Sequence, residues 1–544
     1  MAEHPWWQHA VIYQVYPRSF ADSDGDGIGD LPGVIERLPH LVDLGVDAVW
    51  LSPFFASPQR DVGYDVTDYR SVAPEYGTLD DAQRLIDTAH ELGLKVVFDL
   101  VLNHTSDQHP WFVESRSSRD NPKADWYVWA DAGVGRDGTP TPPNNWRSEL
   151  VVPRAWQWGE ERQQWYLATF LDFQPDLNWY EPEVEAEMTD MIRMWLGRGV
   201  DGFRLDIFHA VMHDASLRPN RFRPQVRGGL PRLDDAAHTL NTDENYALAQ
   251  RLRAVCDEFD GDRALLGEVF GSPRQLQRYV EDDGRQGLNL VFLFDFLVAP
   301  YEAERLRSLI RRFEAEYPFP HVPTYVLENH DRMRSMSRLG GDERKATVLA
   351  ALLCTLRGTA VLFQGQEIGM TNHEIPLRDA DDPIPGVVAP WMPEWLHRLL
   401  PERLNRDEVR VPLSWSAEPG AGFTEPGVTP WLPFHPDHVR VNVEAERHDP
   451  GSLLAWYRRL LELRRSSPAL QEGTLELFDT DPDVVAFDRA HGDERLAVVA
   501  NLGERTVTHP VNGAEPAATS DPAVRLTATS VTLPPHTAAV LRLP

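Results

Sequence analysis

Short apolar runs alternate with longer amphipathic stretches along most of the chain. The runs are rich in β-branched and aromatic residues, which is typical of strands. Eight of them predict strands, at residues 11–16, 48–53, 95–104, 201–209, 264–270, 288–296, 323–331 and 359–365. Apolar residues three to four positions apart predict helices at residues 38–44, 79–92, 183–198, 246–259 and 345–356. This alternation predicts an α/β fold, a parallel (β/α)₈ TIM barrel.

The regular pattern is lost in three places. Residues 105–174 are rich in Trp, Pro, Asp and Gly and too long for a structureless loop, so we expect an inserted subdomain after strand 3. A second polar insertion spans residues 210–245, and a Pro- and Trp-rich segment from 370 to about 450 is expected to cover the barrel mouth. Short alternating runs after a helix at 452–467 predict a C-terminal all-β sandwich. The predicted domains are therefore 1–104 and 175–470 for the barrel, 105–174 for the subdomain and 471–544 for the sandwich.

Composition narrows the class of partner. The formal charge is −31, which argues against nucleic acid and against anionic membrane surfaces and favours an uncharged ligand. The two cysteines, Cys256 and Cys354, lie far apart in apolar contexts, so they predict neither a disulfide framework nor a Cys-based metal site. The N-terminus has no signal-peptide pattern and the chain has no apolar run that could span a bilayer. We therefore expect a soluble cytoplasmic protein.

An acidic loop follows the first predicted strand. In residues 22–30 four aspartates alternate with small residues, an arrangement that can turn several oxygens towards one hard cation. An EF-hand is excluded because the twelfth position is Gly33, where that motif needs a bidentate Glu. The alternatives left open are a structural cation site, for Ca²⁺ or Mg²⁺, and an acidic solvated turn.

Three of the predicted strands end in carboxylates, namely Asp206, Glu268 and Asp331. Glycosidic cleavage needs two carboxyl groups, one that protonates the leaving oxygen and one that attacks or stabilises an oxocarbenium-like centre. Arg204 shares a strand face with Asp206, so we expect it to keep Asp206 ionised, as a nucleophile requires. Glu268 lies among apolar residues, which suits a proton donor. An isolated Arg-x-Asp would more simply be a structural ion pair; the set at strand ends favours catalysis.

Five stretches carry a resemblance to a known family. Residues 99–104 (DLVLNH), 202–206 (GFRLD), 268–270 (EVF) and 329–331 (NHD) resemble, in order and spacing, the signature stretches of the α-amylase superfamily, glycoside hydrolase family 13. Residues 174–178 (QPDLN) resemble a motif of its α-glucosidase and oligo-1,6-glucosidase branch. The resemblance extends over almost the whole chain.

The resemblance implies a retaining, exo-acting α-glucosidase that releases terminal non-reducing glucose from short α-glucosides, with transglucosylation as a further activity. It implies Asp206 as nucleophile, Glu268 as acid and then base, and Asp331 as a third carboxylate that grips ring hydroxyls. By the same matching, the glucose-binding residues are Asp61, Tyr64, His104, Arg204 and His330. The implied ligands of a structural Ca²⁺ are Asp22, Asp24, Asp26, the carbonyl of Ile28 and Asp30, and no organic cofactor is expected.

Several alternatives stay open. The first is an oligo-1,6-glucosidase, because Ile207 after the nucleophile matches neither the Thr or Ala of α-1,4 enzymes nor the Val of α-1,6 enzymes in this branch. Glucosyl-transferring or isomerising relatives, such as trehalose synthase and sucrose isomerase, come next; the sucrose isomerases' Arg-Leu-Asp-Arg-Asp signature is absent after Asp331. A non-catalytic transporter partner is a remote alternative, since all three carboxylates are kept. Glu328 also departs from the branch, which often has Asn there. Both a monomer and a homodimer are compatible with the sequence.

Overall fold

The computed structural model describes residues 4–150, 154–227, 230–280, 286–388, 390, 392–398 and 404–544. The predicted subdomain (105–174) and the predicted insertion (210–245) therefore each contain a few residues outside the described set, 151–153 and 228–229. The two predicted barrel ranges likewise include 1–3, 281–285, 389, 391 and 399–403, which lie outside it.

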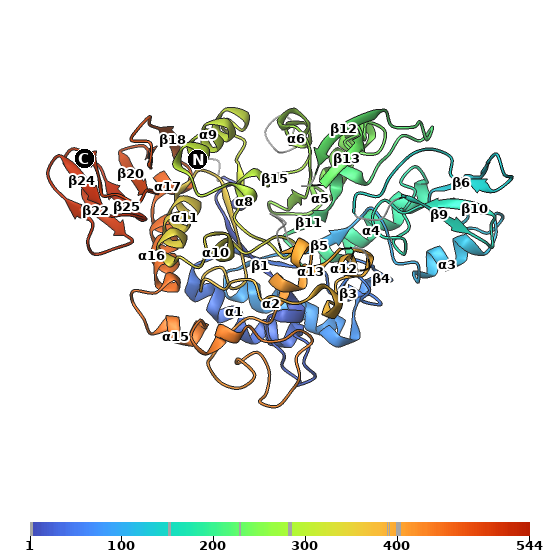
Figure 1. The fold of residues 1–544 in the computed structure, drawn as a ribbon, viewed down its shortest axis with the longest axis horizontal. Helices are drawn as coiled ribbons and strands as arrows, with labels where there is room; N and C mark the ends of the chain where they lie inside the picture. Colours follow the sequence, from blue (N-terminus) through green and yellow to red (C-terminus); the bar gives the residue numbers. More distant parts are fainter. Residues whose placement is uncertain are drawn as a thin grey trace.

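Eight parallel strands close into a barrel, which confirms the predicted (β/α)₈ fold. Each strand pairs with the next one along the chain, and the first closes on the last. The strands are β1 (Val11–Val15), β2 (Ala48–Leu51), β5 (Lys95–Val101), β11 (Gly202–Asp206), β14 (Ala264–Gly267), β15 (Leu290–Leu293), β16 (Thr324–Val326) and β17 (Thr359–Phe363). Figure 1 shows the barrel elements in the middle of the molecule.

The helices predicted at 79–92, 183–198, 246–259 and 345–356 are found within three residues of these bounds, whereas the helices at 110–117, 273–279 and 303–316 lie where the sequence analysis predicts none. The longer ones are α1 (Leu31–Leu44), α2 (Leu79–Glu91), α3 (Pro110–Ser117), α4 (Pro182–Gly197), α5 (Asp243–Cys256), α6 (Pro273–Tyr279), α9 (Ala303–Glu316), α11 (Glu343–Thr355) and α16 (Leu453–Ser466). The first helix begins at Leu31 and not at residue 38. Asp30 caps it by accepting a hydrogen bond from Gly33 N at 2.6 Å. Gly33 and Pro39 inside this helix interrupt the apolar repeat and hide its first two turns from the pattern.

The barrel strands are shorter than their apolar runs. The run at 264–270 continues past the end of β14 at Gly267, and the run at 323–331 continues past the end of β16 at Val326. Val269 lies beyond the strand and is nevertheless buried. Because the loops at the carboxyl ends of the strands pack into the barrel mouth, burial alone does not mark where strand pairing stops. Glu268 and Asp331 therefore stand on loops just after their strands.

Small antiparallel sheets lie on the loops at the barrel's carboxyl end. A three-stranded sheet contains β6 (Trp129–Asp131), β10 (Gln164–Leu167) and β9 (Trp156–Gly159). It appears at the right of Figure 1, with the hairpin of β12 (Phe222–Arg227) and β13 (Leu230–Asp234) above the barrel. Two-stranded sheets are formed by β3 (Phe55–Ala56) with β4 (Asp68–Val72) and by β7 (Gly133–Val134) with β8 (Pro140–Thr141). Asn145 and Asn220 join the subdomain to the insertion, with Asn145 Nδ2 donating to the Asn220 carbonyl at 2.8 Å.

The C-terminal region forms two packed antiparallel sheets, as predicted. One contains β18 (Thr474–Leu477), β19 (Val484–His491), β20 (Glu494–Asn501), β25 (Thr537–Arg542) and β22 (Glu515–Thr519). The other contains β21 (Val507–Pro510), β24 (Ser530–Leu533) and β23 (Arg525–Leu526). Val499 and Val531 belong to the apolar cluster between the sheets, whereas Phe487 and Val498 belong to the main core with residues of α16. The sandwich is thus continuous with the barrel and not tethered by a linker.

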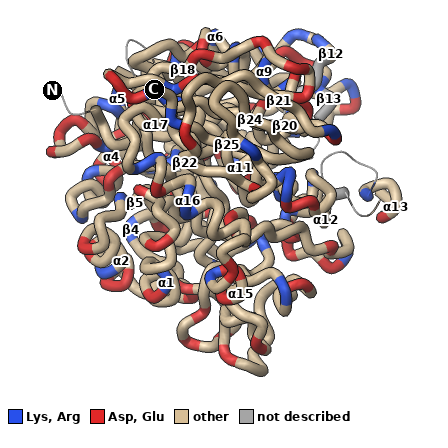
Figure 2. The backbone as a smooth tube through the Cα atoms, turned by 90° about the vertical axis from the view of Figure 1, so that its left-hand side faces the viewer, with Lys and Arg blue, Asp and Glu red and all other residues tan. Residues whose placement is uncertain are grey.

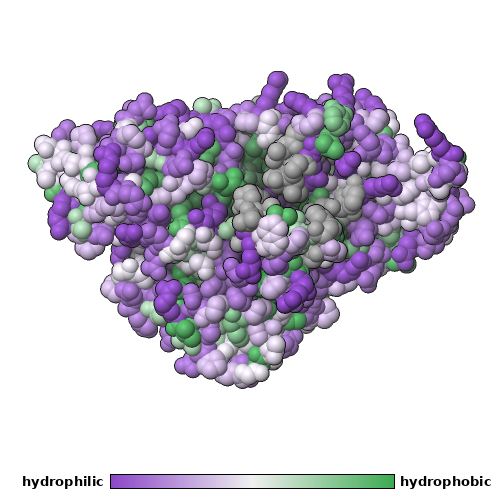
Figure 3. Space-filling model, in the orientation of Figure 1, coloured by the Kyte–Doolittle hydropathy of each residue, from purple (hydrophilic) through white to green (hydrophobic). Residues whose placement is uncertain are grey.

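The described residues of the segment from 370 to 450 form short helices and turns: η5 (Leu377–Asp379), α12 (Pro383–Val388), α13 (Glu394–His397), α14 (Asp407–Arg410), η6 (Pro436–Val439) and α15 (Val443–Arg447). Acidic and basic residues are interspersed on the side that carries the C-terminal sheets (Figure 2). Hydrophilic residues cover most of the face seen in Figure 3. Among the described residues, none of the helices combines the length and the apolar character that crossing a bilayer requires.

Candidate active site

One arginine holds three carboxylates at the carboxyl end of the barrel. Arg204 on β11 is almost fully buried, and its Nη1 donates to Asp99 on β5 at 2.8 Å and to Asp206 at 2.7 Å. Its Nη2 donates to Glu268 Oε2 at 2.6 Å, just after β14. The register of the barrel explains the first contact, because Arg204 and Asp99 are paired positions of β11 and β5. Asp206 and Glu268, which are 62 residues apart in the sequence, are thereby side by side.

The electrostatics of this cluster depend on burial as well as on Arg204. Burial raises the pKa of Asp206 well above its ordinary value; Arg204 opposes the shift, and Glu268 and Asp99 add to it. Burial likewise raises the pKa of Asp99, to about 6. The predicted contact of Arg204 with Asp206 is present, but the guanidinium is divided among three carboxylates and burial outweighs its effect on the pKa of Asp206.

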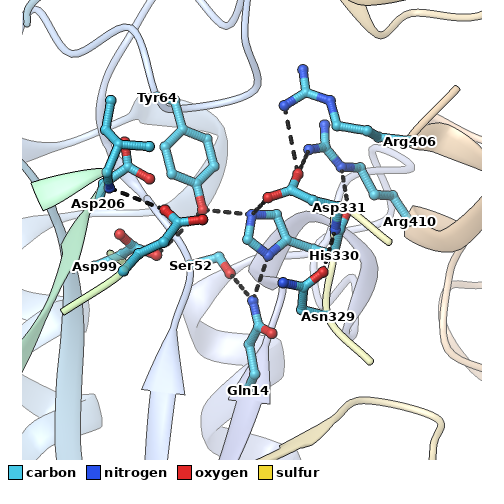
Figure 4. A network of polar contacts seen from close by, with 12 residues as sticks. Gln14, Ser52, Tyr64, Asp99, Asp206, Asn329, His330, Asp331, Arg406 and Arg410 are labelled. Atoms are coloured by element: carbon cyan, nitrogen blue, oxygen red, sulfur yellow. Dashed lines mark hydrogen bonds and ion pairs between the residues drawn. The ribbon is translucent and has the colours of Figure 1, made fainter. Parts of the chain in front are cut away.

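His330, on the loop after β16, lies in a chain of hydrogen bonds (Figure 4). Gln14 Nε2 on β1 donates to His330 Nδ1 at 2.7 Å and to Ser52 Oγ at 3.1 Å. With Nδ1 as acceptor, the ring proton is placed on Nε2, which faces the Tyr64 hydroxyl at 2.7 Å and Asp331 Oδ2 at 3.2 Å. Burial lowers the pKa of His330 to about 3, so the ring is neutral at physiological pH. It can direct a donor towards an oxygen without adding charge.

Asp331 is surrounded by cations. Arg410 Nη2 donates to its Oδ1 at 2.8 Å, and Arg406 Nη1 lies 3.5 Å from the same oxygen. Arg410 is also bound through its Nε to the carbonyl of His330 at 3.0 Å. Burial opposes ionisation of Asp331, but His330, Arg410 and Arg406 together outweigh it and lower its pKa. Asp331 is a carboxylate at any physiological pH.

Asp61 joins this cluster through the same arginine. Arg406 Nη2 donates to Asp61 Oδ1 and to Asp382 Oδ1, each at 2.7 Å. Gln174 Nε2 donates to the other oxygen of Asp61 at 2.9 Å. Arg406 thus ties the loop between β3 and β4 to the loop after β16, and Asp382 binds the same nitrogen of Arg406.

The eight predicted catalytic and binding residues form one connected set. Tyr64 links the two clusters, since its hydroxyl lies 3.3 Å from Asp99 Oδ2 as well as facing His330. His104 is buried beside it, with its Nε2 3.1 Å from the Tyr64 carbonyl and its Nδ1 3.0 Å from Asn103 Oδ1. Burial lowers the pKa of His104 to about 3. All the predicted residues therefore surround the same part of the barrel mouth.

Sequence reasoning missed several members of this site. Asp99 stands out in the sequence only as the first residue of a motif, and Arg406 and Arg410 lie in a segment without periodicity. Their spacing of four, which puts them on one side of a helical turn, is the only signal the sequence offers. Glu328, the residue that departs from the branch, is fully buried behind the site, where it accepts Ser335 N at 2.5 Å and lies 3.3 Å from Arg334 Nη1.

The acidic loop brings part of the predicted metal set together. Oxygens of Asp22, Asp24 and Asp30 lie within 4.8 Å of one another, so they could hold a metal ion. An all-oxygen set of this kind fits a hard cation. Asp26 is not in this group and instead accepts a hydrogen bond from Ile28 N at 2.7 Å. The loop is braced from outside, where Trp431 N donates to the Gly27 carbonyl at 3.0 Å.

Fold and site together define a (β/α)₈ barrel enzyme whose candidate reactive groups are carboxyl groups at the barrel mouth. Residues 14–473 match the family model described as alpha amylase, catalytic domain, and residues 472–540 match a model described as a domain of unknown function. The chain belongs to the α-amylase family of glycoside hydrolases, in its α-glucosidase and oligo-1,6-glucosidase branch.

Relatives and solved structures agree with this placement. The chain is 42% identical to a probable alpha-glucosidase of Rhizobium meliloti (strain 1021), over 94% of this chain and 93% of that one. It is 36% identical to an oligo-1,6-glucosidase of Parageobacillus thermoglucosidasius, over 93% and 92%. The crystal structure of the alpha-glucosyl transfer enzyme XgtA superposes with a TM-score of 0.89 at 39% identity, covering 100% of both chains.

Proposed function

We propose that this protein is a retaining, exo-acting α-glucosidase that releases glucose from the non-reducing ends of short α-glucosides. The observation that carries the proposal is the Arg204 fork, which binds Asp206 with one nitrogen and Glu268 with the other. Two carboxyl groups held side by side by one guanidinium can serve as nucleophile and acid on the same glycosidic bond. The named activities of the relatives in this branch support the same reaction.

In the proposed mechanism Asp206 attacks the anomeric carbon while Glu268 protonates the departing glycosidic oxygen. A covalent β-glucosyl ester on Asp206 results, and Glu268, now a carboxylate, accepts a proton from the water that hydrolyses it. The raised pKa of Asp206 means that its charge depends on Arg204 being available to it. When Glu268 is protonated and neutral, more of the charge of the Arg204 guanidinium acts on Asp206. The proton that catalysis needs on Glu268 therefore also favours the ionised form of Asp206.

The remaining side chains fit the recognition of a terminal glucose. Asp331, which stays ionised, would accept hydrogen bonds from two ring hydroxyls, and His330 and His104 would act as neutral partners to others. Tyr64 offers a flat ring to the sugar face. The ion pairs from Arg406 to Asp61 and Asp331 tie two loops together at one side of the site, which supports a pocket closed beyond a single glucose.

Linkage is the finer part of the proposal. We put α-1,4 bonds first, because the relative of highest identity named here is a probable alpha-glucosidase, and α-1,6 bonds second, because an oligo-1,6-glucosidase is similar over nearly the whole chain. The similarity to an alpha-glucosyl transfer enzyme supports transfer of the glucosyl group to sugars as a side activity.

The acidic loop would hold Ca²⁺ as a structural ion, through Asp22, Asp24 and Asp30, and contribute no chemistry to the reaction. We place the enzyme in the cytoplasm, where its two free, buried cysteines would remain reduced. Size-exclusion chromatography would distinguish a monomer from a homodimer.

Product analysis tests the function. The purified protein is incubated separately with maltose, isomaltose, sucrose and trehalose, and glucose and transfer products are separated by chromatography. Glucose mainly from maltose is expected; a preference for isomaltose would replace the α-1,4 assignment, and no product from any sugar would refute the proposal.

Replacement of the nucleophile tests the mechanism. Asp206→Ala should lower kcat by at least about 10⁴-fold, because no covalent intermediate can form. Added azide should restore turnover of an activated aryl α-glucoside and give the β-glucosyl azide, since azide attacks from the face that Asp206 has vacated. Substantial hydrolysis of maltose by the variant would place the nucleophile elsewhere.

A further inference from the structure

Ile207, the residue after the proposed nucleophile, has an unusual backbone. Its φ and ψ are both 38°, in the left-handed region that a β-branched residue occupies only at a cost. Such conformations persist where the surroundings fix them, and they cluster at functional sites. The conformation of Ile207 therefore points to a function for this turn.

Hydrogen bonds on both sides fix the turn to Glu268. The main-chain N–H of Ile207 donates to Glu268 Oε2 at 3.0 Å. The next amide, that of Phe208, donates to the main-chain carbonyl of Glu268 at 2.9 Å, and Ala210 N closes the turn onto the Ile207 carbonyl at 3.0 Å. The Ile207 side chain packs on the apolar cluster that contains Phe170 and Leu240. Strand β11 thus ends in a way that aims one amide at the side chain of Glu268.

The two oxygens of Glu268 have different surroundings. Oε2 accepts from Ile207 N–H and from Arg204 Nη2, at 3.0 Å and 2.6 Å. Within the part of the chain that the structure describes, no donor contacts Oε1. Two donors on one oxygen favour charge there, so the proton of the neutral acid belongs on the other oxygen.

We infer that Ile207 is a positioning residue for general acid catalysis: its left-handed turn directs an amide to Glu268 Oε2, and Oε1 is the atom that delivers the proton. In this step the O–H bond of Oε1 breaks as the glycosidic oxygen takes the proton and its bond to the anomeric carbon breaks. The electron pair left on the carboxylate is stabilised at Oε2 by the two donors. The inference rests on the proposed role of Glu268 as the acid.

The test is to replace the amide at position 207 by an ester, using the α-hydroxy acid that corresponds to isoleucine. This removes the N–H and keeps the side chain. The same replacement at Phe208 is the matched control, because it removes a hydrogen bond to the main chain of Glu268 and leaves the carboxyl group untouched. Each variant is assayed with maltose, whose leaving group needs a proton, and with 2,4-dinitrophenyl α-glucoside, whose leaving group does not.

For the ester at 207 we expect kcat/KM to fall about 10- to 100-fold with maltose, a part of the 10²- to 10⁴-fold that a general acid supplies, and less than about 3-fold with the dinitrophenyl substrate. The ester at 208 should affect both substrates equally. Equal losses for the ester at 207, or no loss, would overturn the inference. Glu268→Gln separates a failure of the inference about Ile207 from a failure of the proposed function. A large loss confined to maltose supports the role of Glu268 as acid, and an equal loss on both substrates refutes the proposed function itself.

A spectroscopic measurement covers the case in which the ester variant does not fold. With isoleucine labelled by ¹⁵N, the amide proton of Ile207 should resonate far downfield in the unmodified protein, as expected for a donor to a carboxyl group. It should move upfield in Glu268→Gln, whereas the ¹⁵N-labelled Phe208 amide should stay in place. An Ile207 amide that does not respond to Glu268→Gln would refute the contact.

Discussion

The pKa values of the carboxyl groups are shifted in opposite directions in the two halves of the active site, the half around Arg204 and the half around Asp331. Around Arg204 one cation serves three carboxylates, and burial raises the pKa of Asp206 and that of Asp99. Around Asp331, Arg410 and the more distant Arg406 supply two cations, although Arg406 also binds Asp61 and Asp382. The pKa of Asp331 is lowered although burial opposes this. Both groups lie in the barrel mouth, so depth alone does not decide the charge. The number of cations that contact each carboxylate does: two for Asp331, and one, shared among three carboxylates, for Asp206.

The difference matches the tasks that we propose for the two halves. A carboxylate that only holds sugar hydroxyls works best when it is permanently charged. A nucleophile that becomes an ester and an acid that then acts as a base both change charge during the reaction, which a cluster short of cations allows. Contacts with two cations keep a binding carboxylate charged, whereas one cation shared by three carboxyl groups allows their charges to change during turnover.

The largest effect is expected when the shared cation is removed. Arg204→Ala removes the cation that three buried carboxyl groups share, and we expect a loss of at least about 10³-fold in kcat/KM and about 3–5 kcal/mol in the free energy of unfolding. Steady-state kinetics and urea denaturation measure both. Arg193→Ala, which removes an exposed bidentate pair with Glu258, is the control and should change stability by less than about 1 kcal/mol. Similar effects of the two variants would contradict the role given to Arg204.

Removing a cation from the other half should have a smaller effect. Arg410→Ala leaves Asp331 with Arg406 and His330, so its pKa rises and its grip on the sugar weakens. We expect kcat/KM to fall about 10²-fold, as one charge-assisted contact to a buried group is worth about 1.5–3 kcal/mol. The acid limb of the pH profile should move to higher pH. Arg398→Ala, an exposed residue paired with Glu394 in the same segment, should leave the kinetics unchanged; a matching loss there would indicate general disruption of the segment.

The pH dependence of stability tests whether the pKa values of Asp99 and Asp331 are shifted in opposite directions. The pKa of Asp99 is about 6 in the folded protein, above its ordinary value of 3.8. The folded state therefore binds a proton that the unfolded state does not, and stability is gained as pH falls from 7 towards 5, by up to about 1.4 kcal/mol per unit. Asp99→Asn should flatten this slope in denaturation curves at several pH values. Asp331 has the opposite sign: its stabilising contribution is present at neutral pH and lost only as pH falls below its ordinary value. An unchanged slope in Asp99→Asn would show that Asp99 is ionised throughout.

Sequence patterns anticipate the barrel, the sandwich and the residues at the strand ends, because apolar periodicity and strand-end polarity are local. They do not predict that Arg204 is shared among three carboxylates, because this depends on the strand register that places Arg204 opposite Asp99. Nor do they assign Arg406 and Arg410, whose segment reaches Asp331 through tertiary contacts alone. The domain boundaries at 104, 174 and 470 and the catalytic roles stay predictions.

The acidic loop extends the comparison to three carboxylates for which the described contacts include no ion pair with a side chain. Changes there should show the smallest effect. Asp22, Asp24 and Asp30 lie together, and burial raises the pKa of Asp30, with Asp24 adding to the shift. A bound Ca²⁺ would supply the missing charge; at 100 times its Kd it would stabilise the fold by about 2.7 kcal/mol. We expect Ca²⁺ to raise the Tm by a few degrees after treatment with EDTA, with kcat nearly unchanged. Asp24→Asn, which removes an exposed ligand that caps no helix, should abolish the shift, whereas Asp26→Asn should retain most of it. If neither Ca²⁺ nor Mg²⁺ moves the Tm, the loop is a solvated turn, and its carboxylates are tolerated because water, and not an ion, screens them.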